Sequence, residues 1–115
     1  RLSVFEANLR DRFGEIPAPT RELFDVVRMR WACIRLGFEK AIVKNGIMIL
    51  KFIENQHSAY YKSDLFGGIL KAATRAESKF IFRQYNNKLS VVVRNIKNIS
   101  EATAALHELA EKAAQ

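Results

Sequence analysis

The fold is decided by the stretch AIVKNGIMILKFI, residues 41–53. Apolar residues on both sides of Asn45-Gly46 predict two short strands, because an Asn-Gly pair accepts the positive φ angles of a two-residue hairpin turn. Residues 47–53 carry apolar side chains at nearly every position. A strand that is apolar on both faces is typical of the middle of a sheet, so the second strand is expected to be internal.

Two helices are predicted before this hairpin. The first covers residues 2–13, where apolar residues recur at helical spacing, and it ends at Gly14, which accepts positive φ without strain. The prolines in residues 16–19 predict a stiff connector, since the residue before a proline is pushed to extended conformations. The apolar stripe of this helix consists of Leu2, Phe5, Leu9 and Phe13, with Glu6, Arg10 and Asp11 lying off it.

The second helix is expected to begin with Thr20 as its cap and to stop at Gly37. Two helices joined by a short proline-rich turn form a helical hairpin or an angled pair. The side expected to be buried consists of Leu23, Phe24, Val27, Trp31 and Ile34, and the solvent side of Arg21, Asp25, Arg28 and Arg35.

The remaining residues predict a helix, a second hairpin and a last helix. Ser63 is expected to cap the first of these helices, and Ser100 to cap the last one. Residues 79–85 and 88–94 read as strands joined at Asn86-Asn87, because asparagine tolerates the left-handed backbone of such a turn. The expected core side chains of the two helices are Leu65, Phe66, Ile69, Leu70 and Ala73, then Ala102, Leu106, Leu109 and Ala113.

This order of elements is not the regular alternation of strand and crossover helix. It predicts an α+β fold: a helical pair followed by a small, mostly antiparallel sheet with packed helices and a C-terminal helix. A length of 115 residues suits one domain, residues 1–115, cut from a longer protein. The single cysteine forms no disulfide within the chain, and no run approaches the ~18 apolar residues of a membrane span. A cytoplasmic location without a membrane partner is expected.

The net charge of +7 is concentrated in residues 41–98, which hold 10 Lys or Arg and 3 Asp or Glu. Such a segment is either an ordinary solvated surface or a face that collects nucleic-acid phosphates. Basic and aromatic residues occur together at Tyr60-Tyr61-Lys62 and in residues 79–85, although Phe80 and Phe82 share a strand face that suits the core. One continuous basic face with exposed tyrosines would favour nucleic-acid binding, and scattered charges would favour a protein contact.

No catalytic or metal-binding arrangement is visible. His57 and His107 read as surface residues without the partners that tune a catalytic pKa. Cys33 reads as a buried, inert thiol. Glu108 and Glu111 are spaced as a solvated helix face, and Gly67-Gly68 lacks the lysine and hydroxyl residue of a phosphate-binding loop. We therefore expect a domain without catalytic residues, metal or cofactor.

One motif points to a particular biology. The stretch Asp11-Arg12-Phe13-Gly14, followed by Pro17 and later by Leu36-Gly37-Phe38, resembles the C-terminal domain of the bacterial transcription-repair coupling factor. The likeness is close over residues 1–40. It implies a parent protein that is a multidomain, ATP-driven DNA translocase, which removes stalled RNA polymerase and recruits the repair protein UvrA to DNA damage in nucleotide excision repair.

The resemblance also implies a role for this segment. ATP would belong to the motor domains upstream, and this domain would be an autoinhibitory clamp that packs on the UvrA-binding domain and masks it. The implied interdomain contact involves Asn8, Asp11 and Arg12: Asp11 would pair with arginines of the partner domain, or else with Arg12 or another arginine of its own domain. Asn8 stands where the family often has an acid, so one charge is missing. The alternative function is a stand-alone basic nucleic-acid-binding domain.

Overall fold

The computed structural model of the protein describes residues 2–6 and 18–115. It confirms the α+β class: helices and one four-stranded sheet, with a helix at the C-terminal end. Residues 2–6 form a helical turn. The other elements are α2 (Ala18–Leu36), β1 (Phe38–Lys44), β2 (Ile47–Phe52), the 3₁₀ turn η1 (Ala59–Lys62), α3 (Asp64–Thr74), β3 (Phe80–Tyr85), β4 (Lys88–Arg94) and α4 (Ile99–Ala113).

The sheet has the strand order β1-β2-β4-β3, and all three pairings are antiparallel. β2 is internal, as its apolar sequence predicted. Both predicted hairpins are present: Asn45 and Gly46 have φ angles of 55° and 76°, and Asn86 and Asn87 have φ angles of 49° and 64°. These are the left-handed backbone conformations that a two-residue hairpin turn requires.

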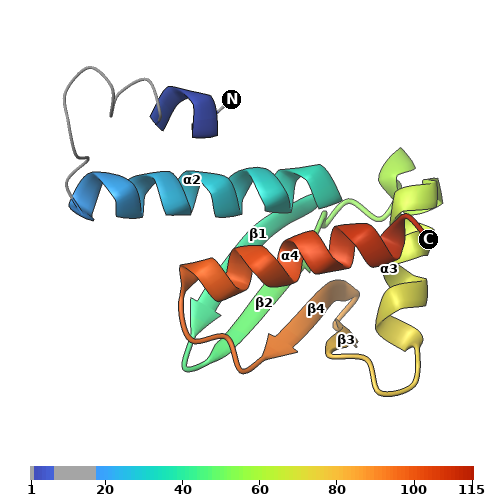
Figure 1. The fold of residues 1–115 in the computed structure, drawn as a ribbon. Coiled ribbons are helices and arrows are strands. Elements are labelled where there is room, and N and C mark those ends of the chain that lie inside the picture. The colour runs from blue at the N-terminus through green and yellow to red at the C-terminus, as the bar shows by residue number, and fades with distance from the viewer. Residues whose placement is uncertain (1, 7–17) are drawn as a thin grey trace.

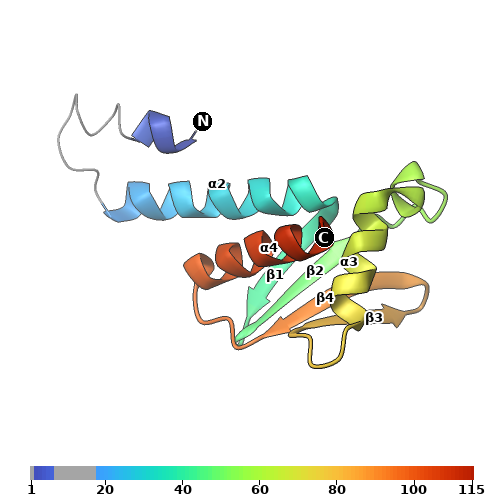
Figure 2. The same ribbon diagram turned by 45° about the vertical axis from the view of Figure 1, so that its right-hand side comes forward.

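The helices cover one face of the sheet. α4 lies across the strands, and α2 runs alongside α4 in both views (Figures 1 and 2). Along β4, Val91 and Val93 are buried and point to the helices, whereas Ser90 and Arg94 point to the other face. The core lies between these two layers and includes Met48, Leu50, Ile69, Phe80, Leu106 and Leu109, all almost completely buried.

Three predicted helix details are wrong. α2 begins at Ala18, two residues before Thr20, because a proline is tolerated in the first turn, where its missing N–H has no partner. α4 is capped by Asn98 and not by Ser100: the Asn98 side chain accepts the Glu101 N–H at 2.9 Å, and Glu101 accepts the Lys97 N–H at 2.8 Å. Together these two bonds satisfy the backbone N–H groups of Glu101 and Lys97 at the start of α4.

The third error concerns the buried side of α2. Its core side consists of Ala32, Cys33 and Leu36, while Leu23, Trp31 and Ile34 are exposed. α2 is apolar on two sides, and the side with the small residues Ala32 and Cys33 is the one that faces α4.

Glu6, expected to lie off the apolar stripe of the first helix, also differs from the prediction. It is buried and forms an ion pair with Arg28, which ties residues 2–6 to α2.

An aromatic cluster, missed in the sequence, joins η1 to the sheet. Tyr60 and Tyr61 pack with Phe52 and Phe66 at ring-centroid distances of 4.9–6.1 Å. The Tyr60 hydroxyl donates a hydrogen bond to the Leu36 carbonyl at 2.6 Å, and the Tyr61 hydroxyl donates to the Ile53 carbonyl. Burial raises the pKa of both tyrosines, so both remain protonated donors.

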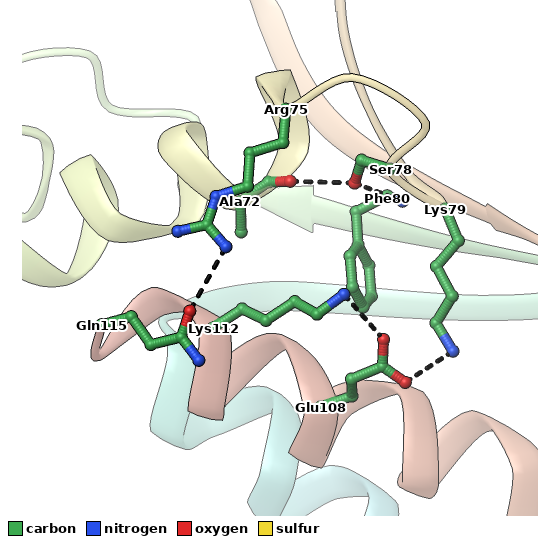
Figure 3. A network of polar contacts seen from close by, with 8 residues as sticks. All are labelled: Ala72, Arg75, Ser78, Lys79, Phe80, Glu108, Lys112 and Gln115. Carbon is green, nitrogen blue, oxygen red and sulfur yellow. Dashed lines mark hydrogen bonds and ion pairs between the residues drawn. The ribbon is translucent and has the colours of Figure 1, made fainter.

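Polar contacts join the C-terminal part of α4 to the segment between α3 and β3, and that segment to the end of α3 and the start of β3 (Figure 3). Glu108 pairs with Lys79 at 2.8 Å and with Lys112 at 3.1 Å. The Ser78 hydroxyl donates to the Ala72 carbonyl at 2.8 Å and accepts the Phe80 N–H at 3.1 Å. α3 itself is capped by Ser63, as predicted, which accepts the Phe66 N–H at 3.2 Å.

Candidate functional site

The residues that the resemblance singled out, Asn8, Asp11 and Arg12, lie outside the residues that the structure describes. The second half of the motif lies inside them. Leu36 and Phe38 are buried, and Gly37, at φ 83°, donates its N–H to the Ile34 carbonyl at 3.0 Å and ends α2 as predicted. This half of the motif therefore packs the core and stops a helix, and it does not form a recognition surface.

The exposed side of α2 is the first candidate interface. We call Leu23, Val26, Arg30, Trp31 and Ile34 the outer α2 face. Its apolar members are exposed by 65% at Leu23, 41% at Val26, 50% at Trp31 and 66% at Ile34. Residues at such spacings share one side of a helix, and apolar side chains collected there are typical of a surface that packs against another protein surface.

The uncovered side of the sheet is the second candidate interface. We call it the open sheet face; it carries six exposed cations, Lys40, Lys44, Lys51, Arg83, Lys88 and Arg94. Between them runs an aliphatic row of directly paired residues, Ile42, Ile49, Val92 and Ile81. Tyr85 stands at one end of β3 with 77% of its surface exposed.

The basic excess is thus divided between faces. Five of the ten basic residues in residues 41–98 lie on the open sheet face, joined there by Lys40. Lys62, Lys71 and Arg75 lie along η1 and α3, and Lys79 is paired with Glu108. Tyr85 is exposed, but Tyr60 and Tyr61 belong to the aromatic cluster. Phe80 is in the core and Phe82 packs against it, as predicted.

The residues considered for catalysis are not brought together. Cys33 is buried, and burial raises its pKa to about 11, so its thiol is almost entirely protonated at neutral pH. His57 and His107 are exposed, one before η1 and the other on α4. The Ser63 hydroxyl is occupied as a helix cap. A Cβ at Gly68 would collide with the Ala113 carbonyl oxygen. Glycine is therefore needed at this position because α3 and α4 lie close together.

Residues 2–6 and 18–115 contain neither a cluster of metal-ligating side chains nor a membrane-spanning helix. No three His, Cys, Asp or Glu side chains are grouped as metal ligands would be in that part of the chain. Among the helices described there, none has the length and apolar content needed to cross a bilayer.

The fold and its surfaces define a small α+β domain whose described residues offer two extended faces and no assembled catalytic pair. The comparisons with known proteins give the family. The chain belongs to the TRCF domain family, whose model matches residues 1–63, a little over half of its length. The match includes the Asp-Arg-Phe-Gly motif and extends through β1, β2 and η1.

The chain is also similar to the transcription-repair-coupling factor of Rickettsia typhi, with 28% identity over 112 residues. The alignment covers 96% of this chain but 9% of that relative, so the chain spans less than a tenth of the length of the relative. No solved structure matches the chain. The resemblance inferred from the motif is thereby confirmed: this is a domain of the kind found in transcription-repair coupling factors.

The sequence analysis did not group the cations of the open sheet face, and it placed Leu23, Trp31 and Ile34 of the outer α2 face in the core. A signal for the open sheet face was present, since Lys51 lies between Leu50 and Phe52 in an apolar strand and must therefore point away from them. For α2, no single residue shows which side of the helix is buried. An apolar stripe occurs on each of two sides, and only packing against α4 determines which one enters the core.

Proposed function

We propose that the chain is the single C-terminal regulatory domain of a transcription-repair coupling factor, and that it acts as an autoinhibitory clamp on the UvrA-binding domain of the same protein. The clamp contributes surface, and the chemistry of the ATP-driven translocase belongs to other domains. By covering the UvrA-binding surface it delays recruitment of UvrA until the factor has engaged RNA polymerase on DNA.

The observation that carries this proposal is the outer α2 face. A patch with Leu23 and Ile34 about two-thirds exposed is unfavourable in water and is relieved when a second apolar surface covers it. The related factor from Rickettsia typhi has more than nine-tenths of its length outside the aligned region, which provides the rest of a polypeptide to supply that surface. Arg30, exposed in the middle of the face, adds a cation for an acidic partner group.

The size of such a contact suits a reversible switch. Interfaces between domains of one chain are modest in area and partly polar, so a closed state lies only a few kcal/mol below an open one. Binding of polymerase to the open state is then enough to shift the equilibrium, because a ligand moves it by the difference between its affinities for the two states.

The test measures the affinity of the full-length coupling factor for UvrA in three forms: intact, without residues 1–115, and with Leu23→Glu and Ile34→Glu together. We expect both altered forms to bind UvrA more tightly, by about 5- to 150-fold, the usual range for coupling between sites. Tyr85→Ser is the matched control, because it removes an exposed apolar residue from the opposite side of the domain and should leave the affinity unchanged.

Equal affinity of the intact and deleted forms would contradict the clamp. A gain on deletion that the α2 variant does not reproduce would keep the clamp and contradict its placement on the outer α2 face. Each variant is first checked for an unchanged thermal unfolding transition, which is expected since Leu23 and Ile34 contribute little to the core.

A further inference from the structure

The open sheet face has an unbalanced charge. Its six cations come from all four strands, while the strands together contain one acidic residue, Glu39. Glu39 lies at the irregularity between Phe38 and Lys40, and its carboxylate accepts the Glu54 N–H at 3.1 Å. Within the described ranges, Lys88 alone among the six forms an ion pair, with Glu54 at 3.7 Å.

The cations are also placed where they repel one another. Lys40 and Lys51 are direct cross-strand partners on the same side of the sheet, and Arg83 extends their row beyond Ser90. Like charges opposite each other weaken a sheet, and such an arrangement becomes favourable when a polyanion lies over it. The face is therefore suited to several negative charges in a line and not to a single ion.

The uncharged residues of the open sheet face indicate which chemical groups accompany the negative charges of the polyanion. Tyr85 is paired with Lys88 at the turn end of the β3–β4 hairpin, and most of its surface is exposed. The half-buried aliphatic row from Ile42 to Ile81 crosses the sheet between the cations, which gives a flat apolar strip bordered by positive charge. A ring beside cations on a flat sheet fits a planar apolar group joined to a phosphate, which is the chemistry of an unpaired nucleotide.

We propose that the open sheet face binds single-stranded nucleic acid, with phosphates at the Lys40–Lys51–Arg83 row and a base stacked on Tyr85. A duplex keeps its bases stacked inside and would leave the ring and the aliphatic strip without partners. An acidic peptide matches the charges but brings no planar ring to Tyr85. This face lies on the other side of the sheet from the helix layer, so the proposal does not depend on the clamp.

The test uses fluorescence anisotropy with the 115-residue chain and a labelled oligothymidylate of about 20 nucleotides. Binding is expected, with an affinity that falls steeply as salt rises, since phosphate contacts release counterions. Lys51→Glu and Arg83→Glu should each weaken binding about tenfold, and Tyr85→Ser should weaken it by a similar factor with little change in the salt slope.

Lys71→Glu is the matched control, because it makes the same charge change on the exposed side of α3 and should weaken binding far less. Equal weakening by Lys71→Glu would show attraction to net charge alone and overturn the site. Absence of binding at low salt would overturn the proposal, as would a duplex or polyglutamate that binds equally well and is equally sensitive to Tyr85→Ser. Far-UV circular dichroism on every variant confirms that the fold is retained.

Discussion

At the scale of single residues, the molecule separates two uses of polar side chains. Glu6 and Tyr60 are drawn inward and matched with Arg28 and the Leu36 carbonyl, so their polar atoms hold segments together. Lys40 and Lys51 are left facing solvent and each other. The first kind of residue supports the fold, whereas the second weakens it slightly.

The Lys40–Lys51 pair gives a prediction at this scale. Lys51→Glu replaces a repulsive cross-strand pair with an attractive one, so the free energy of unfolding should rise by about 0.2–1 kcal/mol. Urea denaturation of the chain at low salt measures the change. Lys51→Gln should give roughly half of the gain, and a gain that persists undiminished at high salt would contradict the electrostatic origin.

At the scale of elements, α3 shows how one helix uses two adjacent glycines differently. Gly67 is exposed with nothing near the position of an added Cβ, while Gly68 lies against the Ala113 carbonyl oxygen of α4. Gly67 lowers the stability of the helix and is not required by any neighbouring atom. Gly68 allows α3 and α4 to lie close together.

The two glycines form a matched pair of substitutions. Gly67→Ala should stabilise the chain by about 0.5–1 kcal/mol, the usual difference in helix propensity. Gly68→Ala should destabilise it, by about 1–3 kcal/mol, because the added methyl group forces α3 away from α4. Thermal unfolding monitored by circular dichroism distinguishes them, and a shift of the same sign in both variants would contradict the packing described.

The turns and one of the helix caps were predicted from the sequence. The features that were predicted wrongly or missed each have a physical cause. The Asn-Gly and Asn-Asn hairpins and the Ser63 cap are local, since a few neighbouring residues determine them, and they were predicted correctly. The caps Thr20 and Ser100 were wrong, because a proline in the first turn of α2, the Glu101 N–H bonded to Asn98 and the Lys97 N–H bonded to Glu101 decide those ends. The buried side of α2 and the open sheet face depend on tertiary packing, which one helix or strand does not encode alone.

At the scale of the whole molecule, stability depends on pH through Glu108. Hydrogen bonding from Lys79, supported by Lys112, lowers the pKa of Glu108 below its ordinary value of 4.5. A carboxylate with a lowered pKa in the folded state stabilises the fold fully above its unfolded pKa, and this contribution is lost as pH falls through the folded pKa.

Glu108→Gln should therefore lower the free energy of unfolding near neutral pH, by less than about 1 kcal/mol because the pair is partly exposed. The difference from the parent chain should shrink as pH falls below about 4.5. Urea denaturation at a series of pH values measures it. Glu111→Gln, on the exposed side of the same helix, is the control, and an equal pH dependence in that variant would contradict the assignment to Glu108.

The aromatic cluster places a constraint on how this domain can vary. The ring of Tyr60 fills the space that a side chain at position 37 would need, and its hydroxyl is fixed to the Leu36 carbonyl. A larger residue at 37 would be strained by the positive φ of this position and would also need a smaller residue at 60, and the loss of that phenol would leave the Leu36 carbonyl at the end of α2 without its hydrogen bond. In related sequences position 37 should therefore remain glycine wherever an aromatic residue stands at 60, although 22 residues lie between them along the chain.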